Sequence, residues 1–128
     1  MTFVNDPIGD LLTRMRNAQA ARRGRCTAPW SRIKQELCDL LQREGWLQEV
    51  QVKGEDPKKE LEVTFVPGRI LQVKRISTPG RRVYAKSTEL IPVLRGYGSA
   101  ILTTSEGLLI DKEARKRKLG GEVLCTIS

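Results

Sequence analysis

The chain contains no histidine among its 128 residues. This absence removes the side chain that most often transfers protons near neutral pH, together with Ser-His and Cys-His nucleophile pairs and most zinc sites. Cysteine is scarce as well, since Cys26, Cys38 and Cys125 lie far apart and form no Cys-x-x-Cys motif. Because three cysteines cannot all pair within one chain, we expect reduced, buried thiols. These absences weigh against an enzyme and predict no catalytic residue, metal site or cofactor.

Long apolar runs are missing too. No stretch approaches the roughly 20 apolar residues that a membrane-spanning helix needs, and the acidic Asp6 and Asp10 are atypical of a secretory or transit signal. Aromatic residues make up only 5% of the chain, whereas hydrophobic residues make up 39% and charged residues 30%. This balance predicts a globular protein with no membrane partner.

Positive charge is present in excess and is unevenly distributed. The chain has 23 Lys and Arg against 15 Asp and Glu, a formal net charge of +8. Residues 14–34 contain no acid, and residues 69–95 contain only Glu89, whereas acids concentrate between Glu36 and Glu62. Segregated charge favours a face that binds a polyanion, and nucleic acid is the commonest one in a cell. A basic surface that serves only solubility is the alternative.

The hydrophobic pattern of the first half predicts a small α/β domain over residues 1–66. Helical spacing gives way to alternation along this half. The predicted elements are a helix from Asp6-Pro7, a strand over 26–30, a helix capped by Ser31 and ended by Gly45, and a hairpin with strands at 50–52 and 61–65. This αβαββ order places both helices on one face of the sheet.

The second half predicts a β-rich domain with one short helix over residues 67–128, after the break at Pro67-Gly68. The predicted elements are a hairpin of 73–76 and 83–85 around Pro79-Gly80, one helical turn over 90–94, a strand over 99–104, a helix that Asp111 caps and Gly120 ends, and a strand over 122–127. The predicted fold class is therefore α+β, in two small α/β domains.

Four motifs stand out by their order and spacing. They are Asp6-Pro7-Ile8 with Thr13 to Asn17, Pro79 to Tyr84, Gly98 to Gly107, and Asp111 to Cys125. Together they resemble the bacterial form of small-ribosomal-subunit protein eight, most specifically in Thr-Ser-x-Gly followed by Gly-Gly-Glu-x-x-Cys. The resemblance implies a structural, non-enzymatic protein that binds a central-domain helix of 16S ribosomal RNA during assembly of the 30S platform. It also implies a possible repressor of the protein's own operon message.

The same resemblance implies the partners and the location. The partners are small-subunit ribosomal RNA and the neighbouring ribosomal proteins five and twelve, with no small-molecule substrate and no cofactor. The location is the ribosome, in the cytoplasm, with an organelle stroma left open. Two positions depart from the usual family pattern: Thr103 replaces a serine, and Trp30 stands where a small residue is common.

The candidate RNA-binding residues are hydroxyls, cations, an aromatic ring, a carboxylate, an amide and a glycine. In the second half they are Thr103, Thr104, Ser105, Gly107, Glu122, Tyr84, Arg115 and Lys116, and in the first half Arg14, Asn17 and Lys34. Thr104 and Ser105 are the foremost because a hydroxyl both donates to and accepts from base edges and 2′-hydroxyls. The cations are expected to meet phosphates.

Each assignment has an alternative. Thr104 and Ser105 are also typical of turn capping, Tyr84 of a core strand and Glu122 of a solvated surface. Cys125 is expected to pack in the core, and Glu60 and Glu62 are expected on the outer side of a strand, without chemistry. Two alternative functions are a metal-dependent nuclease, which no carboxylate cluster in the basic half supports, and a duplex-DNA binder.

Overall fold

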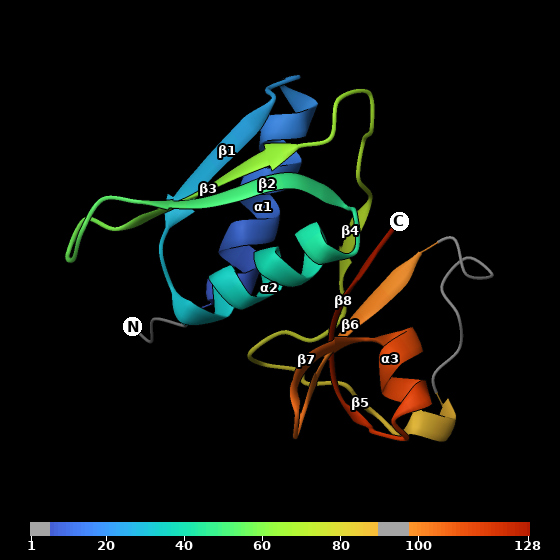
Figure 1. Cartoon of the computed structure of the whole chain (residues 1–128). Helices are drawn as coiled ribbons and strands as arrows, with labels where there is room; N and C mark the ends of the chain where they lie inside the picture. Colours follow the sequence, from blue (N-terminus) through green and yellow to red (C-terminus); the bar gives the residue numbers. More distant parts are fainter. Residues whose placement is uncertain (1–5, 90–97) are drawn as a thin grey trace. The chain divides into compact units, whose positions relative to one another are not determined.

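The computed structural model describes residues 6–89 and 98–128 (Figure 1). The chain divides into two compact units. We call residues 7–71 the N-terminal unit, and Asp6 with residues 72–128 the C-terminal unit. The predicted helical turn over 90–94 lies outside the described residues. The α+β class, in two small α/β domains, is confirmed.

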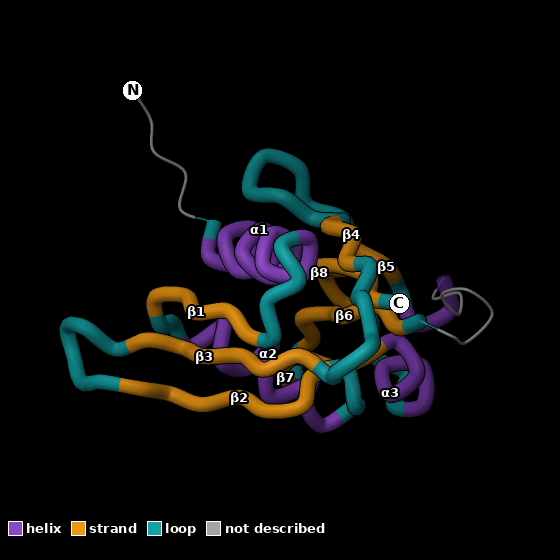
Figure 2. Tube along the Cα trace, turned by 90° about the horizontal axis from the view of Figure 1, so that it is seen from above, coloured by secondary structure: helices purple, strands orange, loops and turns teal. Residues whose placement is uncertain are grey.

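The N-terminal unit has the predicted αβαββ order. Its elements are α1 (Pro7–Ala20), β1 (Arg25–Pro29), α2 (Arg32–Arg43), β2 (Leu47–Lys53) and β3 (Glu60–Phe65). The sheet is antiparallel, and β3 runs between β1 and β2 (Figure 2). Because α1 packs on β1, α2 packs on β2 and the helices contact each other, both cover the same face. The opposite face of the sheet carries mainly polar side chains.

Local sequence signals set the bounds of these helices. Helix α1 begins at Pro7 and buries Ile8, Leu11, Leu12, Met15 and Ala18, which includes every predicted core position. Ser31 caps α2, because its Oγ accepts a hydrogen bond from the Lys34 amide at 3.3 Å. Gly45, with φ of +83°, follows the helix end in the left-handed region that glycine favours. The three predicted helix boundaries, the start of α1 and both ends of α2, are confirmed.

The C-terminal unit is built around its last strand. Its elements are β4 (Val73–Arg75), β5 (Tyr84–Ala85), the 3-10 helix η1 (Ser87–Glu89), β6 (Ser99–Thr104), β7 (Gly107–Ile110), α3 (Asp111–Lys116) and β8 (Gly121–Ile127). Strand β8 pairs with β6 along one edge and with both β4 and β5 along the other, and β7 completes the sheet beside β6. Buried side chains of β6 and β8, among them Ile101, Leu102 and Cys125, form its core.

The predicted hairpin between 73–76 and 83–85 is wrong. The turn at Pro79-Gly80 does close, since Thr78 and Arg81 exchange two backbone hydrogen bonds of 2.8 and 3.0 Å. Beyond that turn, however, β4 and β5 each pair with β8 and not with each other. A distant strand thus supplies the partners that the local turn pattern assigned within the segment.

The region around α3 also differs from the prediction. The sequence analysis did not predict strand β7. This strand forms a hairpin with β6, and the turn between them runs from Thr104 to Gly107. Asp111 does not cap α3: it is the first helical residue, it is 3% exposed, and its Oδ1 accepts from the Ala100 amide at 3.3 Å. The helix ends at Lys116 rather than near Gly120. These are tertiary contacts between segments that the sequence pattern treats separately.

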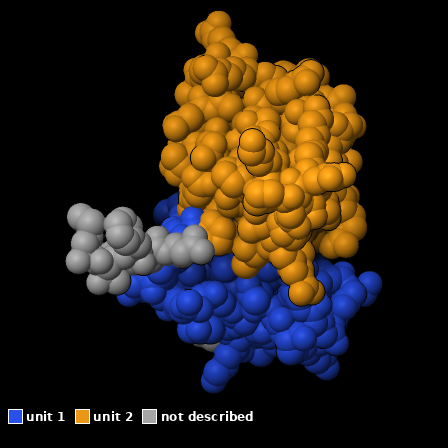
Figure 3. All heavy atoms as spheres, turned by 90° about the vertical axis from the view of Figure 1, so that its left-hand side faces the viewer, with its two compact units in different colours: residues 1–6, 72–128 blue, residues 7–71 orange. Residues whose placement is uncertain are grey.

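The predicted domain boundary lies a few residues from the division between the two compact units along the chain. The sequence placed the boundary between residues 66 and 67, whereas along the chain the N-terminal unit ends at Leu71 and the C-terminal unit continues from Gln72 (Figure 3). The C-terminal unit also includes Asp6, whose carboxylate forms an ion pair with Arg75. Assignment of RNA binding to the second domain stays a prediction.

The three cysteines are free and buried, as expected. Burial raises the pKa of Cys26 to about 11 and the pKa values of Cys38 and Cys125 to about 12. Because the thiolate is the reactive form, all three are inert packing side chains near neutral pH.

Candidate nucleic-acid interface

Three of the predicted residues lie in one row across the C-terminal sheet. Tyr84 on β5 is opposite Glu122 on β8, and Glu122 is opposite Thr103 on β6. Directly opposed residues of antiparallel strands place their side chains on the same face. Tyr84 is 67% exposed, and Thr103 is exposed as well. This sheet row, Tyr84-Glu122-Thr103, therefore places an exposed ring and an exposed hydroxyl on either side of a carboxylate, and the core alternative for Tyr84 is wrong.

Two glycines allow the strands to approach closely beside the sheet row. A Cβ atom on Gly121 would lie 2.0 Å from the Thr103 carbonyl oxygen, and one on Gly120 would lie 2.6 Å from that of Ala85. Neither distance is compatible with a side chain. The Gly-Gly pair seen in the sequence is thus a structural requirement for the row.

The two hydroxyl groups at the turn between β6 and β7, those of Thr104 and Ser105, differ in their hydrogen bonding. Thr104 Oγ1 donates to the Gly107 carbonyl at 2.8 Å and accepts from the Glu106 amide at 3.1 Å. Gly107, with φ of +99°, provides the left-handed backbone that the turn needs. Ser105 is exposed, and its side chain bonds none of the residues in 6–89 and 98–128. The turn-capping alternative therefore describes Thr104, whereas the Ser105 hydroxyl is available to a ligand.

Glu122 is the most enclosed member of the sheet row. Its side chain is 15% exposed and lies 3.8 Å from Nη1 of Arg82. A carboxylate held between a tyrosine and a threonine accepts hydrogen bonds only, so it suits the amino groups of bases. The solvent-exposure alternative does not fit this burial.

The cations of α3 and of the two residues that follow it divide into paired and unpaired side chains. Arg115 donates to the buried Asp111 at 3.1 Å. Arg117 pairs with Glu106 and with Glu113, which raises the pKa of its guanidinium. Three lysines are exposed and form no ion pair within the described residues: Lys112, Lys116 and Lys118. Of the two predicted cations, Lys116 is thus free for a phosphate, while Arg115 mainly holds the helix.

A second basic surface lies in the N-terminal unit. Arg14 and Asn17, on successive turns of α1, line a groove of about 420 Å³ with Arg23, Arg25 and Thr27. Arg14 donates to Asp10 at 3.1 Å and reaches the Thr27 carbonyl at 3.4 Å, which fixes its direction. Sequence reasoning missed Arg23 and Arg25 as site residues, although both belong to the acid-free segment 14–34.

The structure contradicts a surface role for Lys34. Its side chain is only 6% exposed, and Nζ donates to Asp10 at 3.0 Å and to the Pro29 carbonyl at 3.1 Å. The Lys34 hydrogen bond lowers the pKa of Asp10, with a smaller contribution from Arg14. Lys34 therefore joins α1, β1 and α2, because its position on α2 faces the neighbouring helix and strand and not solvent.

The acidic strand β3 is more constrained than predicted. Glu62 does face the open side of the sheet, but its side chain is 13% exposed and pairs with Lys53 at 2.8 Å and with Arg25 at 3.4 Å. The Lys53 hydrogen bond lowers the pKa of Glu62. In the described parts of the chain, no group of three acidic or cysteine side chains is arranged to hold a metal ion, and no helix there is long and apolar enough to cross a membrane.

Comparison with known proteins gives one consistent family. Residues 6–128 match the family described as Ribosomal protein S8. A protein of Rubrobacter xylanophilus is 43% identical over 97% of this chain and 98% of its own, and one of Staphylococcus saprophyticus is 44% identical over 94% and 96%. A protein of Rhodopirellula baltica is 46% identical over 98% and 100%. All three are named small ribosomal subunit protein uS8.

Proposed function

The chain belongs to the ribosomal protein S8 family, and we propose on this premise that it is a structural protein of the small ribosomal subunit which binds ribosomal RNA. The similarity spans nearly the full length of the chain and of its relatives, so it concerns both units. Structural proteins of the ribosome are not a class of enzymes. The corresponding location is the ribosome, in the bacterial cytoplasm if the source is a bacterium.

The observation that carries RNA binding is the arrangement at one end of the C-terminal sheet. The sheet row and the Ser105 turn meet at the end of β6, because Thr103 is followed directly by the turn. Donors and acceptors of this kind read base edges and 2′-hydroxyls in unpaired or distorted RNA. Lys116 and its neighbouring lysines position the phosphates without reading sequence.

The N-terminal unit offers a further contact. The groove of Arg14, Asn17, Arg23 and Arg25 combines three guanidinium groups with one amide. Guanidinium groups match phosphate oxygens in geometry as well as charge. We assign this groove to the RNA backbone.

The finer parts of the proposal follow from the family resemblance. They are binding to a central-domain helix of 16S RNA, assembly of the platform, neighbouring proteins five and twelve, and repression of the protein's own operon message. The contact residues in the C-terminal unit are proposed as Thr103, Ser105, Glu122, Tyr84 and Lys116, with Thr104 and Gly107 shaping the turn and Arg115 holding α3.

The proposal is tested by a salt titration of RNA binding. The full chain is titrated with a central-domain fragment of 16S RNA and with a scrambled hairpin of equal length. We expect the two affinities to fall with similar slopes in log salt, because the phosphate contacts are shared, while the central-domain fragment stays tighter at every salt concentration. Equal affinities throughout would overturn specific RNA recognition.

Two controls address the alternative functions. A DNA duplex of the same length should bind more weakly than the RNA, because DNA lacks the 2′-hydroxyl. Incubation of the RNA fragment with protein and Mg²⁺ should leave the RNA intact. Metal-dependent cleavage would favour the nuclease alternative instead.

A further inference from the structure

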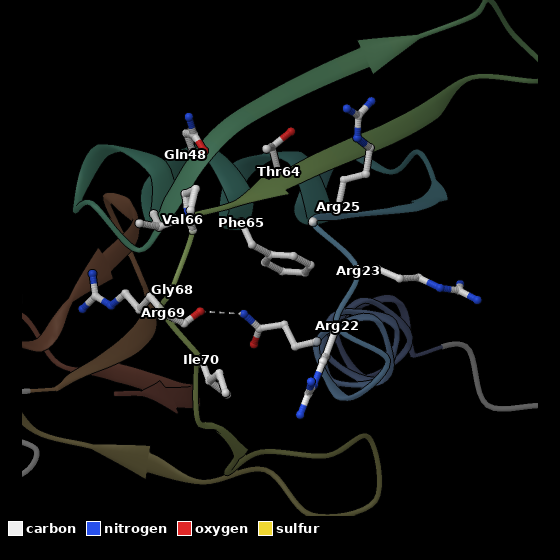
Figure 4. A pocket seen from close by; sticks show the side chains of 13 residues that line it. Arg22, Arg23, Arg25, Gln48, Thr64, Phe65, Val66, Gly68, Arg69 and Ile70 are labelled. Atoms are coloured by element: carbon white, nitrogen blue, oxygen red, sulfur yellow. Dashed lines mark hydrogen bonds between the residues drawn. The ribbon is translucent and has the colours of Figure 1, made fainter.

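A hollow at the C-terminal end of α1 adjoins the groove of Arg14, Asn17, Arg23 and Arg25, and its apolar part has no role in the contacts proposed above. It has a volume of about 590 Å³ and is lined by the end of α1, the turn into β1 and the segment from β3 to Ile70, all within the N-terminal unit. Figure 4 shows the Phe65 ring pointing into it. The volume falls within the roughly 300–1,000 Å³ range of sites that enclose a small organic group.

One wall of the hollow is apolar and held in place. Phe65, 5% exposed, forms its base, and Ile70, 79% exposed, stands at its edge with Pro67 beside it. Gln19 fixes the segment that carries Ile70, since its amide donates to the Arg69 carbonyl at 3.1 Å and its oxygen accepts from the Leu71 amide at 3.0 Å. The first of these bonds is the dashed line in Figure 4. A clustered, fixed apolar patch is typical of a binding surface.

The opposite rim of the hollow is cationic, with guanidinium groups that point away from Phe65 (Figure 4). Arg22, Arg23 and Arg25 contribute to it, and no acidic side chain is among the described residues that line the hollow. Arg22 and Arg23 are exposed, and within residues 6–89 and 98–128 their side chains form no ion pair. Two unpaired guanidinium groups beside an apolar wall suit a ligand with a phosphate and a flat ring.

Arg22 occupies a backbone position that favours glycine. The Arg22 amide donates to the Gln19 carbonyl, and the Arg23 amide donates to the Ala18 carbonyl, which is the hydrogen-bond pattern of a Schellman motif at the end of α1. Arg22 has φ of +58°, where any residue other than glycine is strained. An arginine held at a conformational cost beside this hollow motivates the hypothesis that its side chain has a function there.

We propose that this hollow binds one unpaired nucleotide of an RNA strand, with the base against Phe65 and Ile70 and the phosphates on Arg22 and Arg23. The inference rests on the proposed function, because the strand would belong to the same RNA. RNA is favoured over a protein partner because the hollow shares Arg23 and Arg25 with the groove of Arg14 and Asn17. One cationic surface thus leads a strand past the apolar wall, where any base can stack.

The first test compares two single-stranded probes on the full chain. Hexa-adenylate and a ribose-phosphate hexamer without bases carry the same backbone charge, and their binding is followed by fluorescence anisotropy. We expect hexa-adenylate to bind on the order of tenfold more tightly, because one stacked base contributes about that factor. Ile70→Asn should reduce the difference strongly and leave the affinity for the hexamer without bases unchanged, and any remaining difference belongs to the base contacts proposed for the sheet row.

The matched control is Val52→Asn. Val52 is also exposed, at 37%, but it lies on β2 and does not line the hollow. This variant should retain the preference for hexa-adenylate. If Ile70→Asn retains it too, or if Val52→Asn loses it equally, the base is not held by this wall and the proposal is overturned.

The second test separates the Arg22 side chain from its backbone. Arg22→Gly relieves the strain at a left-handed position, so we expect a melting temperature equal to or above that of the parent chain. The same variant should bind both probes several-fold more weakly, because it loses one phosphate contact. Unchanged binding of both probes in this folded variant would overturn the proposed phosphate site.

The outcomes distinguish this inference from the proposed function. If the central-domain RNA fragment is bound specifically but hexa-adenylate binds no better than the hexamer without bases, only the hollow proposal falls. If hexa-adenylate binding depends on Ile70 while the central-domain fragment binds no better than a scrambled hairpin, only the proposed function falls. If an acidic leucine-containing peptide displaces hexa-adenylate and binds more tightly than it does, the hollow serves a protein and the nucleotide proposal is overturned.

Discussion

At the scale of single residues, the decisive question is whether a polar side chain already has a partner in the protein. Thr104 and Ser105 are adjacent hydroxyls, yet Thr104 makes two hydrogen bonds within its turn and Ser105 makes none within the described residues. A change at Thr104 therefore acts first on the turn, and a change at Ser105 acts first on a ligand.

Ser105→Ala should weaken binding of the central-domain RNA fragment by about 1 kcal/mol or more, because an RNA group loses its hydrogen bond. Its free energy of unfolding should change by less than about 0.5 kcal/mol, since the side chain is exposed. Anisotropy titrations with the fragment and with a generic RNA duplex provide the measurement. An equal loss on both RNAs would remove Ser105 from specific recognition.

The Asp10-Lys34 pair gives a prediction on pH. The Lys34 and Arg14 hydrogen bonds hold the pKa of Asp10 below its ordinary value of 3.8, so folding favours the ionised form. The stabilisation is present above the unfolded-state pKa and is lost as the pH falls through the folded-state pKa. Asp10→Asn should therefore be less stable than the parent chain at pH 7, and the difference should shrink below pH 3.8.

Urea unfolding of both chains from pH 7 to the acid limit of folding measures this difference. Arg32 and Glu36, an exposed pair on α2, provide the control, because Glu36→Gln should change stability little at any pH. A gap between Asp10→Asn and the parent chain that stays constant as the pH falls would contradict the assigned ion pair.

At the scale of elements, strand β8 organises the C-terminal unit. It pairs with β4, β5 and β6, and its first residue, Gly121, lies against the Thr103 carbonyl. The sheet row exists because β8 lies between β5 and β6. Close contact at Gly121 is therefore a condition for the proposed RNA surface.

Gly121→Ala should lower the free energy of unfolding by about 1–3 kcal/mol or more, since the new Cβ would lie 2.0 Å from a backbone oxygen. Gly80→Ala is the matched control, because no atom lies within 4 Å of a Cβ at that position. Thermal unfolding of both variants checks the prediction. Similar melting temperatures for the two would show that β8 and β6 separate without cost.

Helix α3 separates a phosphate contact from a structural one. Lys116→Gln should reduce the slope of log affinity against log salt by roughly one unit for every RNA, with little change in stability. Arg115→Gln should destabilise the unit, because the buried Asp111 loses its cation. Salt titrations paired with urea unfolding distinguish the two effects, and an unchanged slope for Lys116→Gln would exclude a phosphate contact there.

At the scale of the whole molecule, each of the two compact units encloses at least one buried thiol. Cys26 and Cys38 belong to the N-terminal unit and Cys125 to the C-terminal unit. Burial raises the pKa of each thiol by enough to suppress its thiolate at neutral pH. Thiol reactivity therefore reports on the opening of each unit separately.

At pH 8 a thiol reagent should modify all three cysteines more than about a hundredfold more slowly in the folded chain than in guanidinium chloride. Cys26 should react first, because its pKa is raised least. Peptide mass spectrometry after timed labelling identifies each site. A thiol that reacts in the folded protein as fast as in the unfolded chain would contradict its burial.

The sequence alone determined the family and three helix boundaries. These boundaries are the start of α1 at Pro7, the Ser31 cap of α2 and the end of α2 at Gly45. The helix boundaries depend on a few neighbouring residues whose backbone preferences and hydrogen bonds act within one or two turns, and the family depends on motifs that are read directly from the sequence. Only the tertiary structure decided that Lys34 is buried, that β4 and β5 pair with β8, and that the end of α1 meets Ile70 in a hollow. These outcomes depend on which distant segment forms the more stable pairing or packing with a given backbone or side chain. A local sequence pattern carries no information about those distant alternatives.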